Sequence, residues 1–264
     1  MINKVLQGDC LELMRDIPDN YIDLTVTSPP YDNLRTYNGS LEWGEHIWQP
    51  ILKELYRITK QGGVVVWVVG DATIKGSETG TSFKQALFFK EMGFNLHDTM
   101  IYASDKPPLS HNRYEQKFEY MFVFSKGKPK TFNPIMEDCK YAGEVKSART
   151  FRHTGEDLGE THNKTAVKHK KIKGNIWTYS TGFNKSTKDK IAFRHPAIFP
   201  EKLAQDHIIS WSNEGDLVLD CFAGRGTTAI ACMNTNRNYI LMEKEQKYYD
   251  IINKRIESHV KKEG

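Results

Sequence analysis

A strand that runs straight into two prolines constrains this chain more than any other stretch. Apolar and polar residues alternate over residues 22–27, which predicts a β-strand. Pro29 and Pro30 must end it, because proline has no backbone N–H and holds the preceding residue in an extended conformation. Ser28-Pro29-Pro30-Tyr31 is therefore a stiff bend with carbonyl acceptors and one aromatic face. Such a bend suits an amino group that must lose a proton to attack an electrophile, although it also fits an ordinary turn.

A glycine-containing loop far downstream is the second constraint. Residues 217–219 read as a strand and residues 227–233 as a helix, and between them lies Asp220-Cys221-Phe222-Ala223-Gly224-Arg225-Gly226. Glycines in such a loop let the backbone approach a ligand closely, because no Cβ stands in the way. Glu243 follows the next predicted strand, residues 239–242. Its carboxylate can accept hydrogen bonds from both hydroxyls of a ribose.

Both segments resemble motifs of one enzyme family. Residues 27–31, Thr-Ser-Pro-Pro-Tyr, are similar to the catalytic motif of DNA amino-methyltransferases, which carry Asp, Asn or Ser before Pro-Pro-Tyr. Residues 218–228 resemble the S-adenosylmethionine motif of the same family. The catalytic motif comes first, an order similar to that of the β group, in which the usual methyltransferase chain is circularly permuted. The resemblance covers nearly the whole chain except about residues 126–194, and it implies an enzyme of the restriction–modification kind.

The resemblance implies an α/β, Rossmann-like fold with a mostly parallel sheet, helices on both faces and an inserted target-recognition region. It divides the chain into a catalytic half (1–125), a basic target-recognition region (126–194) and a cofactor-binding half (195–264). The alternation of strands and helices independently predicts an α/β sheet. The further strands are expected at residues 4–7, 64–69, 96–102 and 119–124, and the further helices at 11–16, from near Gln49 to Gln61-Gly62-Gly63, at 82–92, from Pro200, and at 246–259.

The resemblance also implies roles for individual residues. The catalytic residues are expected to be Ser28, Pro29, Pro30 and Tyr31. The residues expected to bind S-adenosylmethionine are Asp9, His195, Pro196, Lys202, Asp220, Phe222, Gly224, Gly226, Thr227, Thr228 and Glu243. The family more often has Pro where this chain has Cys221, a departure that concerns packing rather than ligand binding.

The implied mechanism acts on a base flipped out of duplex DNA, since its amine is otherwise engaged in pairing. Tyr31 stacks on the flipped base, and the Ser28 side chain accepts a hydrogen bond from the amine together with the Ser28 and Pro29 carbonyls. The methyl group moves by direct in-line displacement, with no metal and no covalent enzyme intermediate. Family members with Ser before Pro-Pro-Tyr mostly modify cytosine, so cytosine N4 is expected over adenine N6.

Positive charge is concentrated in one segment. Residues 126–194 hold 16 Lys or Arg against 7 Asp or Glu, so with a net charge of +4 for the whole chain the remainder carries −5. A polyanionic partner explains this concentration better than a solvated loop does. Interleaved aromatic residues suit base reading as well as phosphate contact; they are Tyr141, Phe151, Trp177, Tyr179 and Phe183. The lysines chosen as DNA contacts are Lys168, Lys170, Lys171 and Lys173.

The cysteines argue against a metal site and against a covalent mechanism. Cys10, Cys139, Cys221 and Cys232 show no Cys-x-x-Cys spacing, so buried, reduced thiols are expected rather than zinc ligands. None of them follows a proline, so the Pro-Cys nucleophile of cytosine-C5 methyltransferases is absent. No apolar run approaches the ~18 residues of a membrane span, and no signal-peptide pattern opens the chain. We therefore expect a cytoplasmic protein that makes no membrane contact.

Two other classes compete with a methyltransferase. Residues 224–229 also fit the dinucleotide pattern G-x-G-x-x-A, with Glu243 nineteen residues after Gly224, as in an NAD-dependent dehydrogenase. Too few residues follow Glu243 to complete a Rossmann sheet, and hydride transfer has no use for Ser-Pro-Pro-Tyr. A DNA-binding module without catalysis would leave both motifs unexplained. The expected partners of the methyltransferase are double-stranded DNA and, as a candidate, a cognate restriction endonuclease, and the protein is expected to be a monomer or homodimer.

Overall fold

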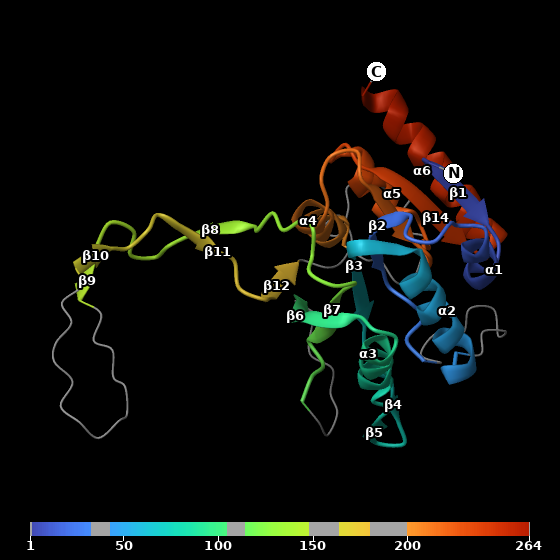
Figure 1. Ribbon diagram of the computed structural model, residues 1–264, viewed down its shortest axis with the longest axis horizontal. Helices are drawn as coiled ribbons and strands as arrows, with labels where there is room; N and C mark the ends of the chain where they lie inside the picture. The colour runs from blue at the N-terminus through green and yellow to red at the C-terminus, as the bar shows by residue number, and fades with distance from the viewer. Residues whose placement is uncertain (1, 33–42, 105–113, 148–163, 180–199, 264) are drawn as a thin grey trace. The chain divides into compact units, whose positions relative to one another are not determined.

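The computed structural model describes residues 2–32, 43–104, 114–147, 164–179 and 200–263. The chain divides into two compact units, one made of Met1–Asn133 and Asn175–Gly264 and the other of Pro134–Gly174. In Figure 1 the first unit is a sheet covered by helices, and the second consists of short paired strands. The limits of the target-recognition region, residues 126–194, remain a prediction, and the second unit lies wholly within them.

Among the described residues, eight strands form the sheet of the first unit, and all of these but β7 run in the same direction. The strand β7 is antiparallel to both of its neighbours, β3 and β6. The predicted mostly parallel α/β sheet is therefore confirmed. Across the sheet, the strands are β1 (Lys4–Gln7), β14 (Asn238–Glu243), β13 (Leu217–Asp220), β2 (Ile22–Thr27), β3 (Thr59–Val69), β7 (Phe118–Ser125), β6 (Asn95–Ser104) and β12 (Ile176–Tyr179).

Helices cover both faces of this sheet (Figure 1). The chain crosses the sheet in one direction from β13 to β14 and in the other from β1 through β2 to β3. Right-handed crossovers therefore put the connecting helices on opposite faces. One face carries α1 (Cys10–Arg15), α2 (Glu45–Ile58) and α3 (Thr81–Glu91), and the other carries α4 (Glu201–Trp211), α5 (Thr227–Met233) and α6 (Gln246–Glu263).

The remaining strands are short antiparallel pairs. In the first unit, β4 (Thr73–Ile74) pairs with β5 (Ser77–Glu78). In the second unit, β8 (Met136–Asp138) pairs with β11 (Lys170–Ile172) and β9 (Val145–Ser147) with β10 (Lys164–Ala166).

The direction in which the chain crosses the sheet reverses between β13 and β2. These two strands are hydrogen-bonded neighbours, although one lies near each end of the chain. In open α/β sheets, ligands bind outside the carboxyl ends of the strands at such a switch point. The two predicted motifs leave β2 and β13 at that place.

The start of α2 lies earlier than the sequence predicts. The helix begins at Glu45, so Pro50 lies inside it rather than in its first turn. The Gly44 carbonyl accepts hydrogen bonds from the backbone N–H groups of Ile47 and Trp48 (2.9 and 3.0 Å). Because this cap already holds the first turn, the N–H that Pro50 lacks does not prevent the early start.

The boundary between α2 and β3 also differs from the prediction. The expected helix stop, Gln61-Gly62-Gly63, lies inside β3, which begins at Thr59 directly after the helix. A Cβ built on Gly63 would lie 2.8 Å from Thr59 Cγ2 and 3.0 Å from the Asp23 carbonyl oxygen. Glycine is therefore required there by the tight fit of the strand, not by a helix cap.

The strand β12 lies within the predicted target-recognition region but belongs to the main sheet, where it pairs with β6. Trp177 and Tyr179 on this strand are only 5% and 7% exposed. The Trp177 ring lies 4.7 Å from the ring of His207, and the Tyr179 hydroxyl donates to Asp206 Oδ2 (2.9 Å). These two aromatic residues are therefore part of the core, and the expectation that they read DNA is wrong.

The two residues that flank the second unit are both held by hydrogen bonds within the first. The Asn133 side chain donates to the carbonyls of Ile209 and Ser212 (3.1 and 3.2 Å). The Asn175 side chain donates to the carbonyl of Thr99 (3.1 Å). The second unit is thus one continuous insertion between two anchored residues.

The described helices include none that is long and apolar enough to cross a membrane. The cysteines are free thiols, as predicted: Cys10, Cys221 and Cys232 are buried and Cys139 is half-buried. Burial raises the pKa of the Cys10 thiol to about 12.

Candidate active site at the carboxyl edge of the sheet

The carboxyl ends of β2 and β13 lie side by side, because the strands are parallel neighbours in which Leu219 pairs with Thr25. The Ser-Pro-Pro-Tyr bend leaves β2 and the glycine loop leaves β13 at this edge. Thr27 Oγ1 donates a hydrogen bond to Asp220 Oδ1 (2.7 Å), and both side chains are buried. The structure therefore joins the two predicted motifs directly, although 193 positions separate them.

Asp220 organises the loop that follows β13. Its Oδ2 accepts from Thr228 Oγ1 (2.6 Å), and its Oδ1 also accepts from the backbone N–H of Phe222 (3.1 Å). Burial raises the pKa of the Asp220 carboxyl, and hydrogen bonds from Thr228, Thr27 and Phe222 partly oppose that shift. Both carboxylate oxygens are thus engaged inside the protein, where they fix the loop to the start of α5.

The two glycines of the loop have different tasks. Both adopt left-handed backbone conformations, with φ of +52° at Gly224 and +71° at Gly226. A Cβ on Gly226 would lie 2.8 Å from Ile252 Cγ2, so this glycine lets the loop pack against α6. A Cβ on Gly224 would meet nothing closer than the Phe222 carbonyl oxygen at 4.0 Å. Gly224 therefore leaves open space at the carboxyl edge.

Phe222 lies with its ring between two tryptophans. Its ring centroid is 5.6 Å from that of Trp43 and 6.1 Å from that of Trp67, and both pairs meet edge to face. Such pairs add about 0.5–1.5 kcal/mol to the burial of the rings. The ring is half-buried, so it anchors the loop on the core while part of it remains accessible.

Glu243 ends β14 with its carboxylate turned to the same loop. Its Oε2 accepts from the backbone N–H of Gly224 (2.8 Å) and its Oε1 from the backbone N–H of Glu245 (2.9 Å). Burial raises the pKa of Glu243 to about 7. Each carboxylate oxygen has a further lone pair, so the group can accept two more hydrogen bonds.

Asp9 lies beside Glu243, because β1 and β14 are parallel neighbours in which Gln7 pairs with Glu243. Its carboxylate caps α1 by accepting from the backbone N–H of Leu11 (3.0 Å). The Lys244 ammonium also reaches it, at 3.3 Å. Asp9 is half-buried and so faces the edge with a partly compensated charge.

The Ser-Pro-Pro-Tyr bend is tied to β7 and to the loop after β3. Ser28 Oγ lies 3.0 Å from the Tyr31 hydroxyl, which donates to Glu119 Oε2 (2.7 Å). The next residue, Asp32, accepts from Thr79 Oγ1 (2.6 Å). A Cβ on Gly70 would lie 3.6 Å from two atoms of the Tyr31 ring. The ring therefore lies against the end of β3.

The other predicted cofactor residues divide into three cases. Thr227 is buried in the first turn of α5. Lys202 on α4 pairs with Asp206, and its side chain is 63% exposed. His195 and Pro196 lie outside the described residues.

The four predicted DNA-contact lysines belong to the second unit. Lys168, Lys170 and Lys171 are exposed and Lys173 is half-buried. The Lys171 ammonium pairs with Glu137 on the neighbouring strand β8 (3.0 Å). Because successive strand residues point to opposite sides, Lys170 and Lys171 cannot face the same surface.

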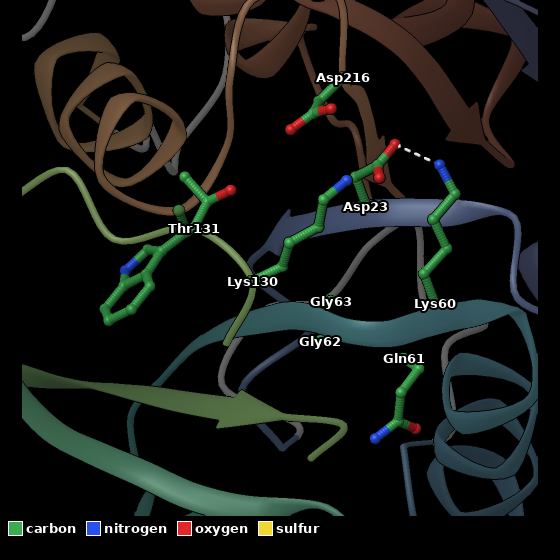
Figure 2. A pocket seen from close by; sticks show the side chains of 9 residues that line it. Asp23, Lys60, Gln61, Gly62, Gly63, Lys130, Thr131 and Asp216 are labelled. Carbon is green, nitrogen blue, oxygen red and sulfur yellow. Dashed lines mark hydrogen bonds and ion pairs between the residues drawn. The ribbon is translucent and has the colours of Figure 1, made fainter. Parts of the chain in front are cut away.

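A small pocket lies at the opposite, amino edge of the sheet (Figure 2). Its volume of about 70 Å³ is far below the roughly 300–1,000 Å³ of ligand sites, and Lys60 pairs with Asp23 in its wall (2.7 Å). None of the predicted site residues that the structure describes lines it; the lining residues are Asp23, Lys60, Gln61, Gly62, Gly63, Lys130, Thr131, Trp211 and Asp216. This pocket is therefore separate from the candidate site. Within the described ranges, no group of three His, Cys, Asp or Glu could hold a metal ion.

Two residues of the candidate site could not be recognised from the sequence. Thr27 stood inside the motif without an assigned role, and only its bond to Asp220 reveals one. Glu119 opens a predicted strand like any other acidic residue. Its position beside Tyr31 follows from the antiparallel direction of β7, which brings the start of that strand to the carboxyl edge.

A family model for DNA methylases matches residues 22–254, a range that contains both motifs. The chain belongs to the DNA methylase family. It is a β-group DNA amino-methyltransferase of the restriction–modification type, as the motifs implied. Its substrate is DNA, and the cofactor of the family is S-adenosylmethionine. Because the chain belongs to this family, the alternative of an NAD-dependent dehydrogenase is excluded.

The methylase is 54% identical over 252 residues to the orphan methyltransferase M.BamHII of Bacillus amyloliquefaciens, a match that covers 94% of this chain and 93% of that one. It is 28% identical over 257 residues to the type II methyltransferase M.BglII of Bacillus subtilis. That match covers 95% of this chain and 68% of M.BglII. Among solved structures, the cytosine-N4-specific PvuII DNA methyltransferase has a TM-score of 0.70 at 22% identity, with 97% and 86% covered. The complex of M1.HpyAVI with S-adenosylmethionine has a TM-score of 0.61 at 20% identity, with 96% and 98% covered.

The bond between Thr27 and Asp220 predicts a measurable contribution to stability. In Thr27→Val, a buried carboxylate loses a donor, so the free energy of unfolding in denaturant titrations should fall by about 1–3 kcal/mol. Thr25→Val is the matched control: Thr25 lies on the same strand, fully buried, and its hydroxyl has no partner among the described residues. That variant should lose less than about 0.5 kcal/mol. Equal losses in the two variants would show that this hydrogen bond does not hold the motifs together.

Proposed function

We propose that this DNA methylase transfers a methyl group from S-adenosylmethionine to the exocyclic N4 amine of cytosine, at a specific site in duplex DNA. The observation that carries the proposal is the hydrogen bond between Thr27 and Asp220, which joins the Ser-Pro-Pro-Tyr bend to the glycine loop. An acceptor bend beside a ribose-binding loop suits transfer between an amine and a nucleoside cofactor. The alternative is adenine N6, whose amine the same acceptors would serve.

The residues at the carboxyl edge fit S-adenosylmethionine. Glu243 has two spare acceptor positions for the ribose hydroxyls, and Gly224 leaves open space above the loop. Asp9 can accept from the adenine amine. The remaining contacts of the proposed site are Phe222, Gly226, Thr227, Thr228, Lys202, His195 and Pro196, with Asp220 holding the loop in shape. When bound, the cofactor supplies a methyl group on a positively charged sulfur.

The Ser-Pro-Pro-Tyr bend then acts on the target base. The base leaves the duplex, because its amine is otherwise paired. The Tyr31 ring is proposed to stack on the base, while Ser28 Oγ and the carbonyls of Ser28 and Pro29 accept hydrogen bonds from the amine. These bonds draw the nitrogen lone pair out of conjugation and aim it, so positioning supplies most of the rate. Pro30 keeps the bend rigid.

The second unit, Pro134–Gly174, is proposed to carry much of the DNA affinity and sequence choice. Its exposed lysines suit phosphate contacts, which are strong and independent of sequence. We propose further that the methylase works as a monomer or homodimer, with a cognate restriction endonuclease as a candidate partner.

The pKa of Glu243 predicts that cofactor affinity depends on pH. Ribose hydroxyls donate to the ionised carboxylate, and burial raises its pKa to about 7. Binding should therefore weaken as the pH falls through 7, by up to about tenfold between pH 8 and pH 6. Calorimetric titration with S-adenosylmethionine measures this.

Two variants test the assignment of Glu243. Glu243→Ala should lose at least tenfold in affinity at pH 8, since hydrogen bonds to a charged group contribute about 1.5–3 kcal/mol each. Glu243→Gln should bind weakly and without the change around pH 7. Glu257→Gln, an exposed site on α6, is the control and should match the wild type. Wild-type affinity in Glu243→Ala would remove this residue from the site.

The lysines of the second unit predict a difference in salt dependence. Lys168→Gln combined with Lys170→Gln should weaken binding to all DNA sequences and reduce the slope of log affinity against log salt by about 2, or roughly 0.9 for each lost phosphate contact. Lys171→Gln should change the slope less, because Glu137 already compensates that charge. Cofactor affinity should not change in either. An unaltered slope in the double variant would mean that another surface carries the DNA.

The choice of cytosine N4 predicts the product. Duplex DNA incubated with the methylase and labelled cofactor, digested and separated by mass, should contain label in N4-methylcytidine. Label in N6-methyladenosine alone would overturn the choice and leave the enzyme class intact. Ser28→Ala should slow transfer without abolishing it, because the Ser28 and Pro29 carbonyls remain.

A further inference from the structure

Three polar groups at the carboxyl edge form a continuous hydrogen-bond chain. Ser28 Oγ lies 3.0 Å from the Tyr31 hydroxyl, and the Tyr31 hydroxyl lies 2.7 Å from Glu119 Oε2. All three residues are half-buried, so they meet both the protein and the space at the edge. The carboxylate is contributed by β7, which runs antiparallel to both of its neighbours, β3 and β6.

The Glu119 carboxylate determines which group donates and which accepts in each of these hydrogen bonds. An ionised Glu119 has no proton to donate and can only accept. Tyr31 has a single hydroxyl proton, which it donates to Glu119. The Tyr31 oxygen must therefore accept from Ser28. The single hydroxyl proton of Ser28 is thus engaged in that bond. The Ser28 oxygen then presents only lone pairs to any other group.

We propose that Glu119 is a positioning residue that makes the target-base site accept an amine and reject a carbonyl. The inference rests on the proposed function, in which Ser28 meets the exocyclic group of the flipped base. An amine at that position donates to the Ser28 oxygen. A carbonyl there faces lone pair against lone pair and leaves a buried polar group unpaired, which is the kind of mismatch that discriminates strongly.

Two other carboxylates near the bend, Asp32 and Asp71, accept from other donors among the described residues. Asp32 accepts from Thr79 Oγ1 and from the backbone N–H of Ala72. Asp71 accepts from the backbone N–H and the hydroxyl of Ser82, at the start of α3. Glu119 is the carboxylate that accepts from Tyr31, so the direction of the chain depends on it.

The test compares binding to two duplexes and needs no methyl transfer. Both carry the site that the wild-type methylase modifies. One keeps the target base, and in the other a carbonyl replaces its amine: uracil for cytosine, or hypoxanthine if the product is N6-methyladenosine. Affinities are measured with S-adenosylhomocysteine present, and the readout is the ratio of the two dissociation constants, carbonyl over amine. Any effect of the altered base pair on flipping is common to all variants.

Two variants break the chain at different points, and one serves as a control. Glu119→Leu removes the acceptor, and Tyr31→Phe removes the hydroxyl and keeps the ring. In both, the Ser28 hydroxyl can turn to donate to a carbonyl, so the ratio should fall about tenfold from the wild-type value. Glu78→Leu, at an exposed position on β5, removes the same charge and should leave the ratio unchanged. Thermal unfolding checks that each variant is folded.

The outcomes separate this inference from the proposed function. If the ratio of dissociation constants in Glu119→Leu equals that of the wild type, Glu119 does not have the proposed role. This conclusion also holds if the ratio falls in Tyr31→Phe alone. A fall in both variants supports the proposed role. If Glu119→Leu does not fold, the test rests on Tyr31→Phe. A wild-type ratio in that variant would show that the Ser28–Tyr31–Glu119 hydrogen bonds do not control which base is accepted. Absence of methyl transfer to either amine by the wild type would instead defeat the proposed function itself.

Discussion

One buried hydrogen bond, from Thr27 to Asp220, holds the candidate site together. The Ser-Pro-Pro-Tyr bend and the glycine loop come from opposite ends of the chain and meet only because β2 and β13 are neighbours in the sheet. The strand pairing brings the two segments to one edge, and the hydrogen bond sets their separation to the length of two side chains. A transfer reaction needs such fixed spacing, since its rate comes mainly from positioning.

Two buried carboxylates at this edge, Asp220 and Glu243, differ in how many of their acceptor positions the protein itself fills. The oxygens of Asp220 accept three hydrogen bonds from the protein itself. Glu243 accepts one backbone N–H at each oxygen and keeps capacity for a ligand. Both pKa values are raised by burial. The first carboxylate therefore holds the loop in shape, and the second has acceptor positions left for a ligand.

Local pattern was enough to predict most of the sheet, because alternation and apolar runs mark strands such as β2 and the buried part of β3. The meeting of the two motifs could be expected only from their resemblance to a family, since nothing local links residues 193 positions apart. The boundary at Thr59 could not be predicted, because the chain passes from helix to strand without a turn. The position of Glu119 beside Tyr31 could not be predicted either, because it depends on the antiparallel direction of β7.

The insertion between Asn133 and Asn175 has a consequence for how such a protein can change. Both flanking asparagines are bonded to backbone carbonyls of the main unit, and these contacts require nothing of the residues between them. The intervening segment can therefore diverge, lengthen or be exchanged as one piece while the sheet edge that carries the candidate site is inherited intact. Under the proposed function, sequence choice and catalysis lie on separate stretches of the chain, so each stretch can change without the constraints that act on the other.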